Sequence, residues 1–525
     1  MKKFIPLILS AAAFAIMFSC VRDNAVGSND DGVSLTEFTE SEIPPDSAMA
    51  SFVLPSAPDF GSGVSVHDPS IFKDDDGTYY TFGSHFAVAS SANLVRWTQY
   101  AGDNQTHRLY GGTSSSNSPW RTVLADAFAH VGNDRDGSPP GSTWAPDVVK
   151  LDGRYYMYYS LSTWGSNRSY IGRVDANSVT GPYSNSAEVV KTPAPGASRA
   201  PNAIDPALFY DKEGKLWMSY GSFFEGIYIF EMETSGQRIG LVKPGQGNYG
   251  KRIHAGGEGP EGPYIFYNPD TDYYYLMVTH GSLSTDYNMR VTRSRNPDGP
   301  YVDIRGRDVT NSNPTGAGSV GNKLAGNYRF EGAPRGYAAL GHNSVLIENG
   351  RYFVIYHTRY QSGTNGVSGN HNQFVNQLFF NDEGWPVMAP NRCAGESAGR
   401  VDPEDAVGEY DLLVHTSVGN DVTFAISSLY SFYSDGSIKA GPFTGGPTGI
   451  KESPREIPHN VMPSSAAAGE WVRTGNYHFV VTIEGVSYNG VMVPQYNSDM
   501  GYAGLSFTGV SPQGVSMWAN KRPVK

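Results

Sequence analysis

The stretch His67-Asp68-Pro69-Ser70-Ile71-Phe72, with the turn residue Gly77 and the aromatic pair Tyr79-Tyr80 behind it, decides how this chain is interpreted. A polar residue beside Pro or Ser, an apolar run, a Gly or Asp turn and an aromatic strand together indicate a β-hairpin. The same design recurs four more times along the chain. The aromatic strands of the five hairpins begin at Tyr79, Tyr155, Leu216, Tyr273 and Tyr352.

The interval between successive hairpins is long enough for a blade of four strands with its loops. Five repeats of this size in an all-β chain predict a five-bladed β-propeller. The alternative is a β-sandwich in which the hairpins recur by coincidence. After Gly384-Trp385-Pro386 the repeat stops, and strand-like runs at 421–426 and 477–483 predict a small separate β-barrel or β-sandwich.

The first 20 residues have the pattern of an export signal. Lys2 and Lys3 precede an apolar run from Phe4 to Phe18, which ends at Ser19-Cys20 and is too short to span a membrane comfortably. A cysteine in this place resembles a bacterial lipoprotein signal, in which that cysteine is lipidated. The alternative is plain cleavage beside an incidental cysteine.

These boundaries divide the chain into four parts. They are a lipoprotein-type signal peptide (1–20), an acidic tether rich in Ser and Pro (21–63), the propeller (64–390) and the C-terminal β-domain (391–525). We expect an exported protein, lipid-anchored to a bacterial outer membrane or secreted if Cys20 is not lipidated.

The composition of the 525 residues excludes several classes of protein. Hydrophobic residues at 39% provide enough material for a core, so most of the chain is not disordered. A net charge of −12 disfavours nucleic acid as a partner. Because the only cysteines are Cys20 and Cys393, there is neither a disulfide framework nor a cysteine-based zinc site.

Three carboxylates are candidates for chemistry. The first strand of each propeller blade lines the central channel, so Asp68, Asp205 and Glu261, which start such strands at matched repeat positions, should converge. A lone Asp before Pro is usually only a turn former. Three carboxylates in one partly desolvated cavity would instead push their pKa values apart, and two such groups flanking a glycosidic bond suffice for its hydrolysis.

Several motifs, in order along residues 64–390, are similar to those of glycoside hydrolase family 43, and two of them resemble its endo-α-1,5-L-arabinanases. The C-terminal region resembles the additional β-domain of two-domain arabinanases. The motifs are His67-Asp68-Pro69-Ser70, Trp144-Ala145-Pro146-Asp147, the stretch 159–167, Ala203-Ile204-Asp205-Pro206, the segment 220–227 and Glu261-Gly262-Pro263-Tyr264-Ile265.

The resemblance implies roles for the carboxylates. Asp68 would be the general base, Glu261 the general acid and Asp205 a third carboxylate that tunes the pKa of the acid and orients it. The family inverts the anomeric configuration, which implies roughly 6.5–9.5 Å between the carboxyl groups of Asp68 and Glu261. Because Glu-Gly-Pro occurs twice in succession, Glu258 is a rival acid; Glu261 is favoured because a strand begins directly behind it.

Trp144 and Trp164 are candidate platforms for sugar rings, although packing in the core is the ordinary role of a Trp. The resemblance implies that His67, Asp147, Asn167, Ser222 and Phe223 also bind substrate. It further implies that His342 helps to hold one calcium ion near the catalytic centre. The acidic run Asp74-Asp75-Asp76-Gly77 is interpreted as a hairpin turn instead of a calcium loop.

The resulting prediction is an inverting hydrolase that cuts internal bonds of arabinan or arabino-oligosaccharides. We expect a monomer that contacts no nucleic acid and reaches a membrane only through its lipid anchor. One alternative is an exo-acting α-L-arabinofuranosidase or β-xylosidase of the same family. The other is a non-catalytic glycan-binding propeller, since a fold does not guarantee chemistry.

Overall fold

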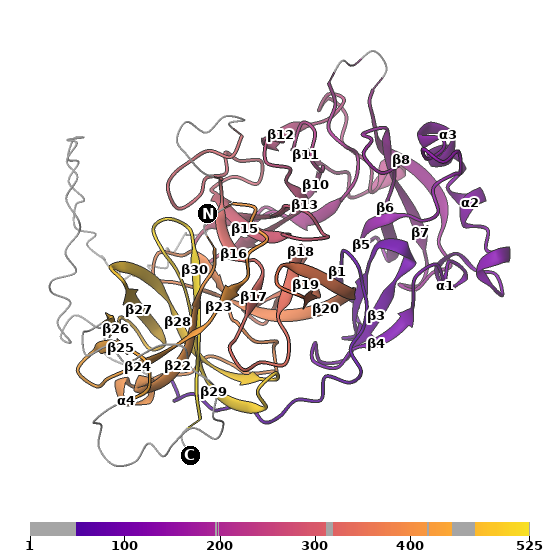
Figure 1. The fold of residues 1–525 in the computed structure, drawn as a ribbon. Coiled ribbons are helices and arrows are strands. Elements are labelled where there is room, and N and C mark those ends of the chain that lie inside the picture. The colour runs from indigo at the N-terminus through magenta and orange to yellow at the C-terminus, as the bar shows by residue number, and fades with distance from the viewer. Residues whose placement is uncertain are drawn as a thin grey trace, which may run out of the picture. The chain divides into compact units, whose positions relative to one another are not determined.

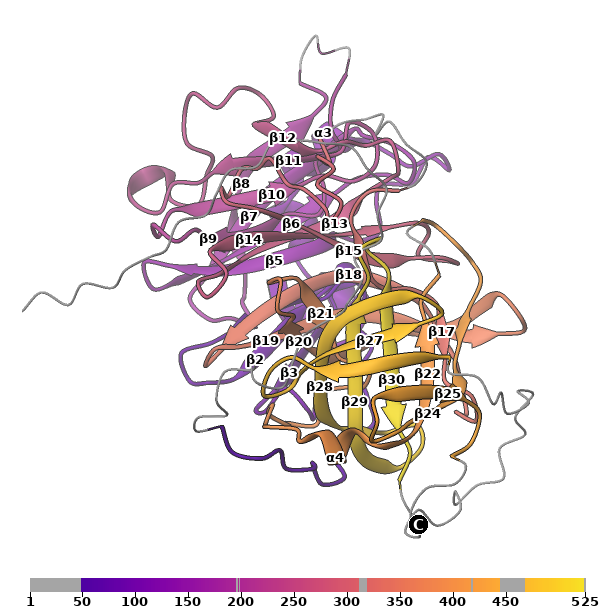
Figure 2. The same cartoon turned by 90° about the vertical axis from the view of Figure 1, so that its left-hand side faces the viewer.

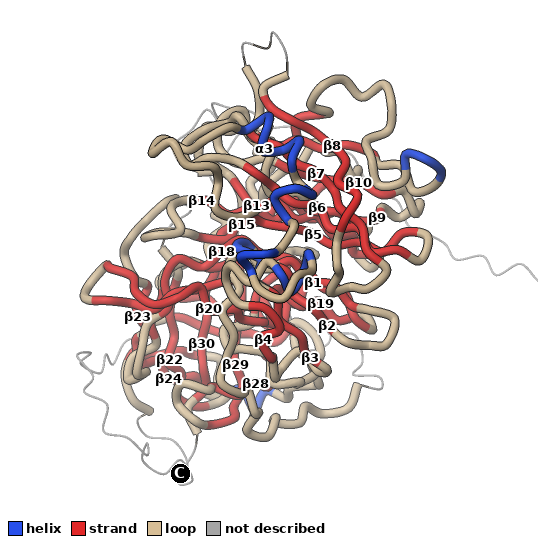
Figure 3. Tube along the Cα trace, turned by 90° about the vertical axis from the view of Figure 1, so that its right-hand side faces the viewer, coloured by secondary structure: helices blue, strands red, loops and turns tan. Residues whose placement is uncertain are grey.

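The computed structural model describes residues 49–194, 197, 199–310, 319–416, 419–443 and 468–523. The predicted signal peptide, with Cys20, and residues 21–48 of the predicted tether lie outside this range. Strands dominate the described chain and its helices are short (Figure 3). Within these ranges, no helix has both the length and the apolar character that a membrane span requires.

Five antiparallel sheets form the blades of a propeller (Figure 1). The first three blades comprise β1 (Ser70–Lys73), β2 (Tyr79–Phe82), β3 (Val88–Ser91) and β4 (Thr98–Ala101); β5 (Trp144–Leu151), β6 (Arg154–Leu161), β7 (Ser169–Ala176) and β8 (Ser184–Thr192); and β9 (Ala207–Tyr210), β10 (Leu216–Tyr220), β11 (Ile227–Glu231) and β12 (Lys251–His254). The other two comprise β13 (Glu261–Asn268), β14 (Tyr273–His280), β15 (Asn288–Ser294) and β16 (Asn322–Ala325); and β18 (Tyr337–Glu348), β19 (Arg351–Ser362), β20 (Gly366–Phe380) and β21 (Pro386–Met388). The fifth sheet is extended by β17 (Tyr328–Arg329) and β23 (Ala425–Ile426).

The remaining strands form a closed barrel, drawn in orange to yellow in Figure 2. Closure results from the pairing of the first barrel strand with the last. A short helix, α4 (Pro403–Ala406), precedes the barrel. The strands of the barrel are β22 (Gly408–Val414), β24 (Ser428–Phe432), β25 (Ser437–Ala440), β26 (Gly469–Arg473), β27 (His478–Ile483), β28 (Val486–Asn497), β29 (Tyr502–Val510) and β30 (Ser516–Lys521). The predicted fold class, an all-β five-bladed propeller followed by a small β-barrel or β-sandwich, is confirmed, and the second domain is a barrel.

Each predicted hairpin turns where the sequence indicated. Gly77, with φ +87°, closes the turn between β1 and β2 and donates its N–H to the carbonyl of Asp74 over 3.0 Å. A positive φ has no steric cost for glycine, which explains the recurrence of this residue at the turns. The acidic run 74–76 is therefore a hairpin turn, as expected.

A residue in the left-handed region stands at the channel end of the inner strand in every blade. Residues other than Gly, Asn and Asp rarely adopt this conformation, so the surrounding contacts must hold Ala145 and His342 in it. The five residues are Asp68 (φ 56°), Ala145 (φ 31°), Asp205 (φ 59°), Gly262 (φ 55°) and His342 (φ 48°). This register corrects one prediction: Asp68 and Asp205 are matched positions, but Glu261 lies one residue ahead of its match, Gly262.

Hydrophobic clusters fill the spaces between blades. Tyr158, Met218 and Phe230 belong to one that joins the second blade to the third, and Phe209 and Ile265 belong to the next. Three short helices between the first two blades, which the sequence did not indicate, pack on the second blade: α1 (His107–Tyr110), α2 (Trp120–Val123) and α3 (Ala125–Val131).

The propeller ring closes beside the first blade. Ser65 forms an antiparallel bridge with Asn372 of β20, and the N–H of Gln373 donates to the carbonyl of Val64 over 3.1 Å. Upstream, Ser51 forms a bridge with Arg400. This part of the predicted tether thus packs on the folded chain instead of being solvated throughout.

The propeller and the barrel share a buried interface. Trp385 and Val387 of the propeller cluster with Val491, Val493 and Val510 of the barrel, and all five side chains are almost completely inaccessible to solvent. Burial of this many aliphatic and aromatic groups is typical of a permanent contact.

Candidate active site

A cavity of about 790 Å³ lies where the five inner strands converge. Every blade contributes to its lining, and one residue, Asn420, comes from the chain after the propeller. The lining residues are His67, Asp68, Ser84, His85, Trp144, Thr163, Trp164, Gly165, Ser166, Asn202, Ile204, Asp205, Ser222, Phe223, Phe224, Glu261, Gly281, Ser282, Leu283, Asp286, Tyr287, His342 and Asn420. The three candidate carboxylates are therefore brought together in one cavity.

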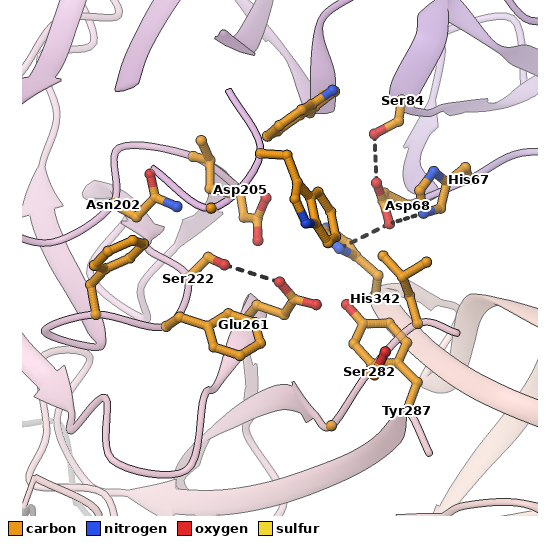
Figure 4. A pocket seen from close by; sticks show the side chains of 18 of the residues that line it. His67, Asp68, Ser84, Asn202, Asp205, Ser222, Glu261, Ser282, Tyr287 and His342 are labelled. Atoms are coloured by element: carbon orange, nitrogen blue, oxygen red, sulfur yellow. Dashed lines mark hydrogen bonds and ion pairs between the residues drawn. The ribbon is translucent and has the colours of Figure 1, made fainter. Parts of the chain in front are cut away.

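Asp68 is held as an anion by its neighbours. Its Oδ2 accepts the hydroxyl of Ser84 over 2.5 Å, and its Oδ1 lies 3.1 Å from His342 Nδ1 and 3.2 Å from His67 Nε2 (Figure 4). Burial alone would raise the pKa of Asp68, but His342 and His67 favour the charged form and bring the pKa well below its usual value. Asp68 is therefore ionised at neutral pH and available as a proton acceptor.

Glu261 has the opposite tendency. Its Oε2 accepts the hydroxyl of Ser222 over 2.9 Å, and Figure 4 shows this pair on the other side of His342 from Asp68. Burial raises the pKa of Glu261 and the charge of Asp68 adds to the rise, whereas hydrogen bonds from Tyr287 and Ser222 and the charge of His342 oppose it. Glu261 is thus the cavity's candidate proton donor.

Asp205 lies beside Glu261 and is almost fully buried. Its Oδ2 accepts the N–H of Gly262, the residue that follows Glu261, over 3.1 Å. Burial raises the pKa of Asp205 to about 7, and the negative charges of Glu261 and Asp68 contribute, against the opposing charge of His342. Asp205 therefore fixes the backbone that carries Glu261 and interacts electrostatically with its carboxyl group.

Glu258, the rival acid, is engaged elsewhere. Its Oε2 forms an ion pair of 2.7 Å with Nη1 of Arg290, whose side chain is completely buried. A buried guanidinium needs such a partner, because leaving it unpaired would be costly. Glu258 is absent from the cavity lining, whereas Glu261 lines it.

Aromatic side chains stand around the cavity. Trp164 is 72% exposed and meets Trp144 edge to face, with 6.5 Å between the ring centroids. Phe223 and Phe224 are each nearly half exposed. Exposed aromatic rings beside a polar cavity suit the apolar faces of sugar rings. Trp164 therefore does not have the core-packing role that is usual for a Trp.

Two predicted substrate contacts lie elsewhere. Asp147 is buried outside the cavity, where it accepts the hydroxyl of Ser70 and the N–H groups of Val148 (2.9 Å) and Leu208 (2.6 Å). It thereby links the inner strands of the first three blades, which corrects its expected role. Burial raises its pKa to about 6.

Asn167, the second of these contacts, lines a separate cavity of about 320 Å³ that also touches Phe224 and Arg199. Its Nδ2 donates to the carbonyl of Ala200 over 3.1 Å. The expectation that Asn167 lines the main cavity is therefore corrected.

Several lining residues were not predicted. Tyr287, which is almost completely buried, lines the cavity and lowers the pKa of Glu261, and Asn202 and Asn420 add amides to the cavity. Phe224 directly follows the predicted Phe223, and this adjacency was a usable signal. Tyr287 and Asn420 occupy no repeated position, so self-comparison of the sequence could not find them.

His342 is surrounded by negative charge. Burial would lower the pKa of His342, but Asp68, Asp205 and Glu261 raise it to about 9. The three carboxyl groups around this imidazole supply the oxygen donors that a hard cation such as Ca²⁺ prefers, and His342 would have to release its proton to join them as a ligand. The residues present are thus compatible with the predicted calcium ion.

Two carboxyl groups whose pKa values are shifted in opposite directions lie in one cavity beside exposed aromatic rings. This combination is typical of a glycoside hydrolase. Comparisons with known proteins agree. Residues 62–386 match Glycosyl hydrolases family 43, and residues 390–519 match a C-terminal lipocalin-like domain of that family. The chain therefore belongs to glycosyl hydrolase family 43.

Individual relatives cover almost the whole chain. It is 37% identical to an extracellular endo-α-(1→5)-L-arabinanase of Thermotoga petrophila, over 90% of this chain and 96% of that protein. Identity to an extracellular endo-α-(1→5)-L-arabinanase of Bacillus subtilis is 35%, over 87% and 93%. A crystal structure of the endo-1,5-α-L-arabinanase of Thermotoga petrophila superposes with a TM-score of 0.75 at 34% identity, covering 89% of this chain and all of that one.

Proposed function

We propose that the protein cleaves internal α-1,5-L-arabinofuranosidic bonds of arabinan with inversion of the anomeric configuration. The observation that carries the proposal is the pair Asp68 and Glu261, which face one cavity with pKa values shifted in opposite directions. The relatives named endo-arabinanases, whose matches span both propeller and barrel, support arabinan as the substrate.

The proposed reaction uses both carboxyl groups in one step. Glu261 donates its proton to the glycosidic oxygen while the bond from that oxygen to the anomeric carbon breaks. Asp68 takes a proton from the water molecule whose oxygen bonds to the anomeric carbon from the opposite face. The reaction leaves Asp68 protonated and Glu261 ionised, and proton exchange with solvent restores both.

Inversion requires room for a water molecule between the base and the sugar. The predicted separation of roughly 6.5–9.5 Å between the two carboxyl groups would provide it, whereas about 5 Å would place a nucleophile against the sugar. Proton NMR during early hydrolysis identifies the first anomer released. Release of the inverted anomer is expected, and release of the retained anomer would reject the assignment of Asp68 as base.

Endo action is favoured over exo action by the exposed aromatic side chains, because Trp164 comes from the second blade and the pair Phe223-Phe224 from the third. Rings on separate blades can hold sugars on both sides of the bond to be cut. Incubation with linear arabinan separates the alternatives: a mixture of oligosaccharides indicates endo cleavage, and arabinose alone indicates exo cleavage.

A non-catalytic glycan-binding propeller is the second candidate, and mutation tests it. Asp68→Asn and Glu261→Gln keep the shapes of the side chains but remove the proton acceptor and the proton donor. We expect each to lower kcat by on the order of 10²–10⁴-fold, the usual contribution of general acid–base catalysis. Wild-type protein that binds arabinan without releasing any product would identify a binding protein.

We also propose that one calcium ion binds beside His342. When bound, such an ion would supply positive charge that stabilises ionised carboxylates, while His342 and the nearby carboxyl oxygens hold it. Addition of calcium is expected to raise the Tm of wild-type protein but not of His342→Ala, which lacks the imidazole ligand. An equal shift in both proteins would place calcium elsewhere.

Export and lipidation of Cys20 complete the proposal. Export is supported by the apolar run 4–18 and by relatives that are named extracellular, whereas lipidation is supported by the position of Cys20 at the end of that run. Mass spectrometry of the mature N-terminus tests lipidation: a diacylglyceryl group on Cys20 is expected, and Cys20→Ser should yield soluble protein without it.

A further inference from the structure

At one position of the propeller repeat, the side chain accepts a backbone N–H group from the next blade in four of the five blades. This position is the seventh residue after the Gly or Asp of the first turn in each blade, and its residues in order are Ser84, Ser160, Gly221, Thr279 and His357. In three blades it is a hydroxyl that accepts the N–H of the left-handed residue in the following blade. These bonds are Ala145 N to Ser84 Oγ (2.8 Å), Asp205 N to Ser160 Oγ (3.1 Å) and His342 N to Thr279 Oγ1 (2.8 Å).

The fifth residue of the series differs from the hydroxyl-bearing residues. His357 stands at the matched position of the fifth blade, and its Nδ1 accepts the N–H of Asp68 over 3.1 Å. Asp68 is the left-handed residue of the first blade, with φ 56°. The backbone of the proposed base is therefore held by an imidazole where the other blades use a hydroxyl or, at Gly221, no side chain.

His357 is itself firmly placed. Its side chain is completely buried on β19, and its ring stacks on Tyr287 with 5.6 Å between centroids and 18° between planes. The hydroxyl of Tyr287 interacts with Glu261 and lowers the pKa of its carboxyl group. The imidazole thus contacts the backbone of Asp68 on one side and the phenol that touches Glu261 on the other.

The hydrogen bond determines the tautomer of His357. Because Nδ1 accepts a proton, the neutral ring carries its own proton on Nε2. Burial lowers the pKa of His357 well below its usual value, and the neighbouring His371 and His67 add to the effect while Asp68 opposes it, so the ring stays neutral.

The same tautomer determines whether three neighbouring histidines could bind a metal ion. His67, His357 and His371 each offer one nitrogen, and the three nitrogens lie within 4.8 Å of one another. A metal-binding imidazole must present a free lone pair. With Nδ1 engaged by Asp68 and Nε2 protonated, His357 has none, so the cluster does not present three ligands while this hydrogen bond exists.

We infer that His357 is a positioning residue that fixes the backbone of Asp68, and thereby the direction of its carboxylate, for attack by water. This inference rests on the proposed role of Asp68 as general base. His357 Nδ1 lies 3.6 Å from Asp68 Oδ1 and has no proton to offer it. The imidazole therefore orients Asp68 through the backbone N–H of Asp68 and donates no hydrogen bond to the carboxylate that must accept a proton.

Three substitutions of His357 test this role. In His357→Asn the amide oxygen is two bonds from Cβ, as Nδ1 is in histidine, so the acceptor is retained. In His357→Gln the oxygen is three bonds away, near the place of Nε2, and His357→Leu has the branching of Asn without any acceptor. Melting temperatures report whether each variant is folded.

The readouts are kcat and KM on linear arabinan, measured beside wild type. We expect kcat of the Gln and Leu variants to fall by on the order of tenfold to 10²-fold, as for a small displacement of a catalytic group, with little change in KM. The Asn variant should recover most of the loss. This pattern separates positioning from a general loss of stability, which would not distinguish Asn from Gln.

Two results would overturn the inference. One is a folded Gln or Leu variant with the kcat of wild type, and the other is an Asn variant as slow as the Leu variant. Failure of the proposed function gives a different result, namely wild-type protein that releases no product from arabinan, in which case Asp68 is no base and needs no positioning.

Discussion

Asp68 and Glu261 line the same cavity but meet different neighbours. Asp68 faces two imidazoles and a hydroxyl, all of which can favour its anion. Glu261 faces hydroxyl groups, while its burial and the charge of Asp68 disfavour ionisation. The side chains around each carboxyl group, not the carboxyl group itself, thus determine which one gives a proton and which one accepts it.

These opposite shifts predict a bell-shaped pH dependence of kcat/KM. Activity should fall on the acid side only well below pH 3.8, as Asp68 becomes protonated, and on the alkaline side above pH 4.5, as Glu261 loses its proton. The charge of Glu261 raises the pKa of Asp205. Because repulsion between two carboxylates disfavours the ionisation of both, Asp205→Asn should move the alkaline limb to lower pH. An alkaline limb unchanged in Asp205→Asn would contradict this electrostatic role.

Substitution distinguishes the two glutamates of the repeated Glu-Gly-Pro. Glu261→Gln should abolish most activity, whereas Glu258→Gln should chiefly lower the free energy of unfolding, because it leaves the buried guanidinium of Arg290 without its carboxylate. Steady-state kinetics and urea unfolding of both variants provide the measurements. Loss of activity in a stable Glu258→Gln variant, with activity retained in Glu261→Gln, would reverse the assignment.

Convergence of Asp68, Asp205 and Glu261 was predictable because propeller geometry relates matched positions. The offset of Glu261 was also available from the sequence, because aligning Pro69, Pro206 and Pro263 places Gly262, one residue after Glu261, opposite Asp68 and Asp205. Asp147 was mistaken for a cavity residue because the sequence places it on an inner strand without showing that its carboxylate binds two other blades.

At the scale of secondary structure elements, each blade holds its neighbour by polar contacts as well as by apolar packing. Ser84, Ser160, Thr279 and His357 accept the N–H of the left-handed residue in the following blade. Since these left-handed residues include Asp68 and Asp205, contacts between blades also determine the geometry of the cavity.

Asp147 links three blades by polar contacts. Asp147→Ala should lower the free energy of unfolding by about 2–4 kcal/mol, because two N–H groups and a hydroxyl lose a shared acceptor. Denaturant titration measures the effect. Asp75→Ala is the control: the Asp75 side chain is 81% exposed and pairs only with Lys150, so its loss should be nearly neutral. Equal effects would deny Asp147 a linking role.

The hairpins of the blades were predictable because each carries its own turn and aromatic strand. The helices α1 to α3 were not, because they are short and their apolar residues show no long helical period. The sequence also left barrel and sandwich open, since barrel closure depends on pairing between strands about a hundred residues apart, β22 and β30.

At the scale of the whole molecule, the segment after the propeller reaches the active-site cavity. Asn420 lines the cavity, and its Oδ1 accepts a hydrogen bond of 2.8 Å from Nη2 of Arg290, the partner of Glu258. The amide group of Asn420 is thereby oriented by the propeller, although it belongs to the later part of the chain.

Asn420→Ala tests whether this segment binds substrate. We expect a rise in KM for arabino-oligosaccharides of about 3- to 10-fold with little change in kcat, because a single hydrogen bond contributes about 1 kcal/mol and Asn420 is not among the proton-transfer groups. Asn420→Asp, with oxygen in place of the amide nitrogen, is the matched control for a lost donor. An unchanged KM in both variants would limit the segment to a structural role.

The bridge between Ser65 and Asn372 closes the propeller ring and affects when the active site can form. Asp68 lies three residues after this seam, the place where Ser65 pairs with β20. His357, which accepts the N–H of Asp68, is on β19, the strand next to β20. During synthesis the base thus stays unassembled until the fifth blade has been made. In the folded protein, a local opening of this seam would displace Asp68 and stop catalysis until the seam closes again, while the other blades remain folded.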